Sequence, residues 1–180
     1  MRHDFADHSL SIFTGQVSDS AGLTRATRER STVAALMKEA FGSEIEILHM
    51  PDGAPFADVQ ASISISHCLS MAALAVAPAH CRPGVDIETL RPQLQRVASR
   101  VFSTTELKHY GKDLRSLTEA WTLKEAAYKA AGIPGLDFRR EIILPTDVSR
   151  IITARGLRLE IVATFAIGEA ILSAVINTQH

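Results

Sequence analysis

Short strand-like and helix-like segments alternate along this chain in two parts of similar size, and this order limits the folds that it can adopt. Residues 9–17 mix β-branched and apolar side chains and predict a first strand, and residues 23–41 repeat apolar side chains at helical spacing. Residues 44–48 and 61–66 alternate with period two, which is typical of strands. The continuous run of small apolar residues at 71–77 predicts a buried strand.

Helix signals open the second part of the chain. Ser103 and Ser116 are each followed three residues later by a glutamate, Glu106 and Glu119, which is the capping-box pattern at a helix start. We therefore expect two helices to begin there, and Gly132 marks the end of the second. The strands predicted after these helices are residues 141–144, 157–165 and 170–176.

The turn predicted at residues 79–83 divides the chain into two halves, residues 1–80 and residues 81–180, and composition restricts their function. With 46% hydrophobic residues, a chain of 180 residues is able to form a core. Its 19 Lys and Arg nearly balance 20 Asp and Glu, which argues against a broad nucleic-acid-binding surface. Cys68 and Cys81 lack zinc-site spacing, so a reduced, cytoplasmic setting is expected. The charged start and the interrupted apolar runs predict neither a secretory signal nor a membrane span.

Acidic residues in two places suggest a cation site. Asp86 and Glu88 are two apart in a probable strand, so their carboxylates project from one face, although such a pair alone is typical of a solvated strand edge. Trp121, Glu125 and Lys129 recur every four residues on the predicted helix, where Glu125 and Lys129 alone would form an ordinary ion pair. Together, three acids suit a hard cation such as Mg²⁺, with further oxygens from a phosphoester substrate. A nearby lysine suits the charge that grows on a transferred phosphate.

Hydroxyl and basic residues in the first half are candidates for holding a phosphate group. Ser66 and His67 follow a predicted strand, where hydroxyl, imidazole and free backbone N–H groups are able to contact a phosphate. A histidine in such a position is more often a hydrogen-bonded turn residue. Arg25, Arg28 and Arg30 cluster near a helix start and are explained either as solvated side chains or as ligands of a substrate with several phosphates.

Four sequence blocks occur in a fixed order: SISH at residues 64–67, GVDIE at 84–88, FSTTE at 102–106 and WTLKEAAYK at 121–129. In this order they resemble the signature of the 4′-phosphopantetheinyl transferases, and the best match is the Sfp-type branch. The resemblance covers residues 63–129 directly. The flanking regions agree with it only in the order of their strands and helices.

The resemblance implies a reaction, a fold and partners. Members of the family transfer the phosphopantetheine arm of coenzyme A to a serine of an apo acyl, peptidyl or aryl carrier protein, release adenosine 3′,5′-bisphosphate and require Mg²⁺. They serve lipid or secondary-metabolite biosynthesis. Their fold is α+β, a pseudo-twofold pair of small antiparallel sheets, each packed by a helix, with coenzyme A in the cleft between the halves. Sfp-type chains carry both halves, so the length of 180 residues implies a monomer.

The matching positions carry the roles that the resemblance implies. Asp86, Glu88 and Glu125 would bind Mg²⁺ together with the pyrophosphate of coenzyme A. Glu125 would also help to remove the proton of the incoming serine, directly or through a water molecule on the metal. Lys129 would stabilise the bridging and leaving phosphate oxygens and supply a proton to them, so that Asp86, Glu125 and Lys129 form the catalytic set. The expected coenzyme A contacts are Ser66, His67, Arg25, Arg28, Arg30 and Lys129.

One departure from the family pattern bears on activity. Many relatives have Gly-Lys-Pro before the histidine block, with a lysine that meets the 3′-phosphate, whereas this chain has Ala54 in place of that lysine. A degenerate homologue that binds coenzyme A or a carrier protein without turnover is therefore one alternative. A Mg²⁺-dependent phosphohydrolase would use the same acids, but it would leave the blocks around His67 and Trp121 unexplained. Trp121 and Phe102 are expected to pack rather than to take part in chemistry.

Overall fold

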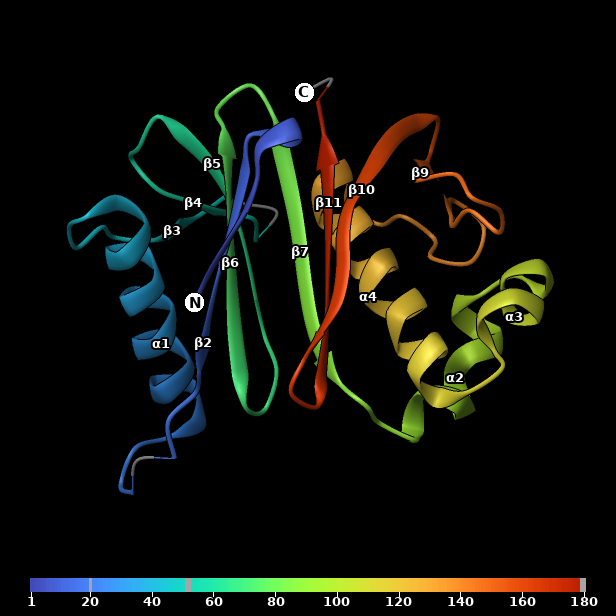
Figure 1. Ribbon diagram of the computed structural model, residues 1–180, viewed down its shortest axis with the longest axis horizontal. Helices are drawn as coiled ribbons and strands as arrows, with labels where there is room; N and C mark the ends of the chain where they lie inside the picture. Colours follow the sequence, from blue (N-terminus) through green and yellow to red (C-terminus); the bar gives the residue numbers. More distant parts are fainter. Residues whose placement is uncertain (20, 51–52, 179–180) are drawn as a thin grey trace.

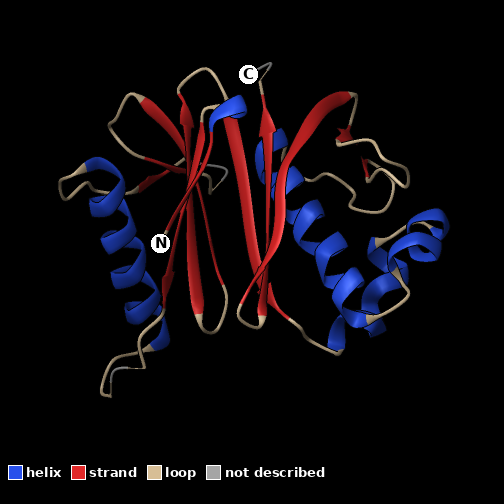
Figure 2. Cartoon of the chain, in the orientation of Figure 1, coloured by secondary structure: helices blue, strands red, loops and turns tan. Residues whose placement is uncertain are grey.

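The computed structural model describes residues 1–19, 21–50 and 53–178, which form an α+β fold (Figure 1). The described residues contain four α-helices and antiparallel sheets of four, five and two strands. The two larger sheets lie next to each other in the middle of the molecule, and helices cover both outer sides (Figure 2). The α+β class implied by the resemblance is therefore confirmed.

The first half contains the four-stranded sheet, the two-stranded sheet and one α-helix. Its elements are β1 (Arg2–Phe5), the 3₁₀ turn η1 (Ala6–His8), β2 (Leu10–Gln16), α1 (Arg25–Phe41), β3 (Leu48–His49), β4 (Pro55–Phe56), β5 (Ala61–His67) and β6 (Met71–Pro78). The larger sheet has the order β1-β2-β6-β5. The Thr24 side chain caps the start of α1 by accepting a hydrogen bond from the Thr27 backbone N–H, and the helix ends at Gly42, whose positive φ of 76° suits glycine.

The second half contains the five-stranded sheet and three α-helices. Its elements are β7 (Arg82–Thr89), α2 (Gln93–Val101), α3 (Thr104–Tyr110), α4 (Leu114–Ala131), β8 (Ile142–Ile143), β9 (Ile151–Ala154), β10 (Leu157–Ile167) and β11 (Ala170–Asn177). The sheet has the order β7-β11-β10-β9-β8, and α4 packs across β7 and β11. β7 is at the edge of its sheet and contacts β5, which is at the edge of the first sheet.

Buried side chains form three clusters that hold this arrangement of helix, sheet, sheet and helices together. Met37 of α1 packs with Phe13 and Leu74 of the first sheet. Alternate residues of the same strands point the other way, so a second cluster fills the space between the two sheets. The third cluster lies between the second sheet and its helices and includes Ala126 and Leu159. Each of the two larger sheets is thus buried on both faces.

Most predicted elements are confirmed, with two corrections. Residues 44–48 do not form the predicted strand, and only Leu48 of that range pairs in β3. The second helix of the second part, α4, starts at Leu114 rather than at Ser116, because the Asp113 carboxylate accepts a hydrogen bond from the Ser116 N–H at 2.8 Å and acts as the cap. The capping box of Ser103 and Glu106 at the start of α3 is present as predicted.

Serine hydroxyls join the two sheets where β5 meets β7. The Ser64 hydroxyl accepts a hydrogen bond from the Val85 N–H at 3.1 Å, and the Ser66 hydroxyl accepts one from the Ile87 N–H at 3.4 Å. These contacts satisfy backbone donors on the edge strand β7. The period-two serines of β5 therefore have a structural role at the junction.

Gly84 of β7 allows α4 to pack directly on the strand. A Cβ atom at this position would lie 1.9 Å from the carbonyl oxygen of Ala126 and 2.8 Å from the backbone nitrogen of Ala130. Both are backbone atoms, so only a shift of the whole helix relieves the clash. The glycine therefore sets the separation between the acids of β7 and those of α4.

We expect Gly84→Ala to lower the free energy of unfolding by about 1–3 kcal/mol, the usual cost of overpacking. Urea unfolding measures this loss. Gly15→Ala is the matched control, because a Cβ atom there would meet only the flexible side chains of Thr32 and Leu36, at 3.3 Å. Equal losses in the two variants would show that the approach of α4 to β7 is not as tight as the structure indicates.

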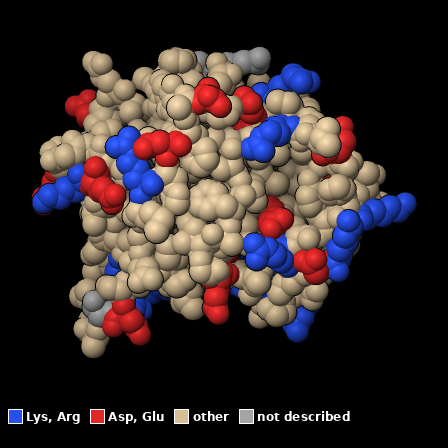
Figure 3. All heavy atoms as spheres, in the orientation of Figure 1, with Lys and Arg blue, Asp and Glu red and all other residues tan. Residues whose placement is uncertain are grey.

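Charged side chains of both signs are interspersed on the face of the molecule shown in Figure 3. This distribution accords with the formal net charge of −1. Among the described residues, the structure contains no helix with the length and apolar character needed to cross a membrane.

Candidate active site

The predicted acids and the predicted lysine lie where α4 packs on β7. Asp86 and Glu88 belong to β7, and Glu125 and Lys129 belong to α4. The Lys129 ammonium donates hydrogen bonds to Oδ1 of Asp86 and to the carbonyl oxygen of Val85, both at 2.9 Å. These two bonds fix the lysine beside the strand that carries the first two acids.

Asp86 is the most enclosed member of this group, with only 6% of its surface exposed. Its Oδ1 atom accepts hydrogen bonds from Lys129 and, at 2.7 Å, from the Ser66 hydroxyl. Its Oδ2 atom is buried and has no hydrogen-bond partner among the described residues. A buried carboxylate oxygen without a partner is costly, and a cation contacting Oδ2 would remove that cost.

The acids influence one another's ionisation. Burial raises the pKa of Glu125 to about 7; the negative charges of Asp86 and Glu88 add to the rise, and the Lys129 ammonium opposes it. Burial also raises the pKa of Glu88, with the positive charge of Arg91 opposing and the charge of Asp86 adding. The site therefore concentrates negative charge.

These residues fit a hard divalent cation that takes part of its coordination from a substrate. Within residues 1–19, 21–50 and 53–178, no group of three or more His, Cys, Asp or Glu side chains is arranged to hold a metal ion by itself. Mg²⁺, however, usually keeps several waters and binds through one or two carboxylates plus phosphate oxygens. The unpartnered Oδ2 of Asp86 suits this mode of binding, whereas the Glu88 carboxylate accepts a hydrogen bond from Arg91.

A pocket of about 710 Å³ extends from Lys129 toward α1. Ser66, His67 and Arg30 line it, together with the apolar side chain of Val33 and others. The structure therefore brings three of the expected coenzyme A contacts in the first half into one cavity with Lys129. A hydroxyl, an imidazole and two cationic side chains are suitable groups for an anionic ligand.

Glu29, to which the sequence assigned no role, lines this pocket and pairs with Arg25, a fourth expected coenzyme A contact. It is buried, and its Oε1 accepts a hydrogen bond from Arg25 Nε at 2.6 Å and lies 3.4 Å from Nδ1 of His67. The spacing of Arg25 and Glu29 is the signal that could have revealed this pair. Arg28, in contrast, donates to the carboxylate of Asp19.

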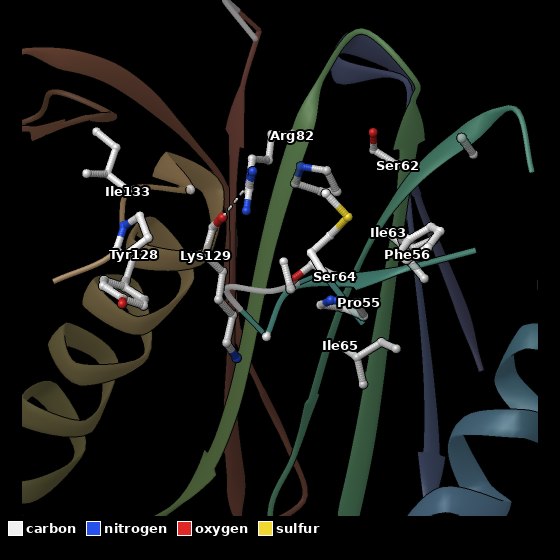
Figure 4. A pocket seen from close by; sticks show the side chains of 17 residues that line it. Pro55, Phe56, Ser62, Ile63, Ser64, Ile65, Arg82, Tyr128, Lys129 and Ile133 are labelled. Atoms are coloured by element: carbon white, nitrogen blue, oxygen red, sulfur yellow. Dashed lines mark hydrogen bonds between the residues drawn. The ribbon is translucent and has the colours of Figure 1, made fainter. Parts of the chain in front are cut away.

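A second pocket, of about 410 Å³, shares Lys129 with the first (Figure 4). Ala54, Arg82 and Tyr128 are among the residues that line it. Arg82 Nε donates to the carbonyl oxygen of Lys129 at 3.1 Å, near the end of α4 (dashed line in Figure 4). Ala54, where the resemblance predicts a lysine, therefore shares a cavity with two cationic side chains, Arg82 and Lys129.

The half of the chain that carries the acids matches a known protein family. Residues 82–170 match the family model described as 4′-phosphopantetheinyl transferase superfamily. This region is a domain of that superfamily. The match runs from the first residue of β7 to the first residue of β11 and includes all three acids and Lys129. A comparison of the chain with curated proteins finds no match.

Within the transferase-superfamily domain, the aromatic residues of two sequence blocks pack against neighbouring elements. The Trp121 ring stacks on Phe138 with ring centres 6.0 Å apart, and Phe102 is fully buried in the cluster beneath α4. Tyr128 contacts the same Phe138 ring. Packing, as expected, accounts for Trp121 and Phe102.

Lys124, which precedes the candidate base Glu125, is fully buried in the transferase-superfamily domain, and the sequence analysis gave it no role. Its ammonium contacts Oε1 of Glu106 at 2.9 Å and donates to the carbonyl oxygens of Phe138 and Ile142, both at 2.5 Å. Burial lowers the pKa of Lys124, and the hydrogen bond and charge of Glu106 oppose this change. Glu106 is thus both a helix cap and the partner of a buried lysine. This pair connects α3, α4 and the segment before β8.

Proposed function

We propose that the protein transfers the 4′-phosphopantetheine moiety of coenzyme A to a serine of an apo carrier protein, as an Mg²⁺-dependent transferase of the Sfp type. The superfamily domain suggests phosphopantetheinyl transfer and implies a transferase. The observation that carries the specific proposal is the pairing of Lys129 with Asp86, whose buried Oδ2 has no partner among the described residues. Glu88 and Glu125 belong to the same strand and the same helix as these two residues. The shared pocket with His67 supports coenzyme A as the donor.

In this proposal the three acids would hold Mg²⁺. The Oδ2 atom of Asp86 would be one of the ligands, because it is buried and has no other partner among the described residues. When bound, Mg²⁺ withdraws negative charge from the pyrophosphate and fixes its orientation. Glu125 would supply a further carboxylate oxygen from the helix, and Glu88 would supply one from the strand after its contact with Arg91 loosens.

Glu125 is the proposed general base, because its carboxylate is able to accept the proton of the incoming serine. The serine oxygen then bonds to the β-phosphorus of coenzyme A while the bond from that phosphorus to the bridging oxygen breaks. Adenosine 3′,5′-bisphosphate leaves with the bridging oxygen. Lys129, held beside Asp86, stabilises the charge on that oxygen and supplies a proton to it.

Binding of coenzyme A is assigned to side chains of the first half and to Lys129. We propose that His67 contacts the 3′-phosphate and that Arg30 adds positive charge in the same pocket. Ser66 lines this pocket as well, but its hydroxyl proton is donated to Asp86. Arg25, which is hydrogen-bonded to Glu29, adds a further positive charge for coenzyme A. Arg28 would first have to break its hydrogen bond to Asp19.

The remaining features of the proposal concern the whole chain. We propose that residues 1–80 and 81–180 are the halves of a pseudo-twofold fold and that the protein acts as a cytoplasmic monomer. Each half has a sheet with a helix packed on it, which supports the first point. Cys68 and Cys81 are buried free thiols, which supports a reduced compartment. The acceptor is an acyl or peptidyl carrier protein, and no nucleic acid or membrane takes part.

A second candidate function is binding of coenzyme A or a carrier protein without turnover. Ala54 favours it, because the lysine expected at this position would have contributed to holding the donor. Arg82 and Lys129 in the same pocket weaken this alternative, since they already supply positive charge there.

The test is incubation of the protein with coenzyme A, Mg²⁺ and a panel of apo acyl and peptidyl carrier proteins, followed by intact-mass measurement of each carrier. We expect at least one carrier to gain one phosphopantetheine group. Carriers whose acceptor serine is replaced by alanine, and reactions containing EDTA, are the controls and should gain none. Binding of coenzyme A without a mass gain on any carrier would favour the non-catalytic alternative. Hydrolysis of coenzyme A without a mass gain would indicate a phosphohydrolase.

A further inference from the structure

The Ser66 hydroxyl occupies an unusual position between the two sheets. It donates a hydrogen bond to Oδ1 of Asp86 at 2.7 Å and accepts one from the Ile87 N–H at 3.4 Å. Ser66 is buried, and it belongs to β5, whereas both of its partners belong to β7. One residue of the first sheet therefore contacts a carboxylate of the second.

The neighbouring serine of the same strand provides a comparison. Ser64 projects to the same side of β5, and its hydroxyl accepts a hydrogen bond from the Val85 N–H at 3.1 Å. That contact secures the backbone of β7. The contact of Ser66 secures the backbone and also an acidic side chain.

The contact decides which oxygen of Asp86 is left for another ligand. Ser66 and Lys129 both donate to Oδ1, so that oxygen is saturated, while Oδ2 is buried without a partner. The carboxylate torsion of aspartate is soft, and a lysine alone is able to pair with either oxygen. A second donor, arriving from a different sheet, restricts that rotation.

We propose that Ser66 is a positioning residue that fixes Asp86 with Oδ2 turned toward a divalent cation. This inference rests on the proposed function insofar as it takes Asp86 as a cation ligand. This role takes the place of the contact with the 3′-phosphate that the resemblance implies, because the single hydroxyl proton of Ser66 is donated to Asp86. Cation binding and the junction of the two sheets are thereby coupled, because the same carboxylate takes part in both.

The test is binding of Mn²⁺ alone, measured by electron paramagnetic resonance in the absence of coenzyme A, so that any phosphate contact of Ser66 plays no part. We expect Ser66→Ala to weaken Mn²⁺ binding about 10- to 100-fold, the usual effect of losing a hydrogen bond to a charged group. Ser66→Thr retains the hydroxyl and should bind more tightly than Ser66→Ala. Ser64→Ala removes a junction hydroxyl of the same strand and should bind as the unchanged protein does. Thermal unfolding of every variant shows whether the fold is kept.

The outcomes separate this inference from the proposed function. Unchanged Mn²⁺ binding in Ser66→Ala, or equal weakening in Ser64→Ala and Ser66→Ala, overturns the positioning role while the metal site stands. Absence of Mn²⁺ binding in the unchanged protein overturns the inference, whereas the carrier-protein mass measurement still decides the proposed function. Weakening confined to Ser66→Ala, with recovery in Ser66→Thr, supports the inference whether or not a carrier protein has been identified.

Discussion

Replacement of Glu125 by glutamine is expected to lower the rate of phosphopantetheinyl transfer by about 10²–10⁴-fold, the usual contribution of a general base. Weaker Mg²⁺ binding should add to this loss. Glutamine keeps the shape of the side chain but has neither its charge nor its basicity. The measurement is the rate of transfer to an apo carrier protein at saturating Mg²⁺ and coenzyme A. A rate equal to that of the unchanged protein would remove Glu125 from the mechanism.

The stability of Glu125→Gln is the control that shows whether this variant is folded. Without metal, burial raises the pKa of Glu125 to about 7 in the folded protein, above the ordinary value of 4.5. The folded state thus holds this proton more tightly, so the contribution of Glu125 to stability is largest below pH 4.5 and is lost as the pH rises through 7. Glutamine avoids that loss, and in EDTA at pH 8 Glu125→Gln should be more stable by up to about 3 kcal/mol. Lost activity in a protein of higher melting temperature could not be ascribed to unfolding.

Comparison of Asp86→Ala with Glu125→Gln distinguishes the loss of a metal ligand from the loss of a general base. Its activity should fall mainly because Oδ2 no longer contacts the cation, so high Mg²⁺ should restore part of it. Glu125→Gln should gain much less from added Mg²⁺. Full activity of Asp86→Ala in ordinary buffer would contradict its assignment as a ligand.

Local spacing explains why part of the candidate site was predictable from sequence. Glu125 and Lys129 are four residues apart on a helix with clear start and stop signals, so their common side followed from helix geometry. Asp86 and Glu88 followed in the same way from the two-residue period of a strand. The sequence predicts a start of α4 at Ser116, later than the observed start at Leu114. The reason is that the pattern of Ser116 and Glu119 also fits a capping box, whereas the cap in the structure is Asp113.

The contacts that cross between elements were not predictable in this way. The hydrogen bond from Ser66 to Asp86 joins two sheets, and the serine pattern of β5 fits an exposed strand equally well. Glu29 reaches His67 only because α1 packs against the first sheet. The buried state of Lys124 is the largest departure from expectation, since lysine is rarely buried unless paired. Its partner, Glu106, was already explained as a helix cap.

Lys124→Met is expected to lower the free energy of unfolding by about 3–5 kcal/mol, the usual cost of removing one partner from a buried ion pair. All three hydrogens of the ammonium have acceptors, namely Oε1 of Glu106 and the carbonyl oxygens of Phe138 and Ile142. Methionine has similar length but no charge, so it leaves the Glu106 carboxylate uncompensated in the core. Urea unfolding measures the loss.

Two further variants show whether the loss arises from the buried pair. Lys108→Met changes an exposed lysine of α3 in the same way and should alter stability by no more than about 0.5 kcal/mol. The double variant Lys124→Met/Glu106→Gln should recover part of the stability lost in Lys124→Met, because a neutral amide replaces the isolated charge. The recovery is only partial, since the one amide oxygen is able to accept from the Leu144 N–H or the Ser103 N–H but not from both. The pair holds α4 against α3 and the segment before β8, so its loss should also loosen the helix that carries Glu125. If Lys124→Met were no less stable than Lys108→Met, neither burial of the lysine nor its pairing with Glu106 would hold in solution.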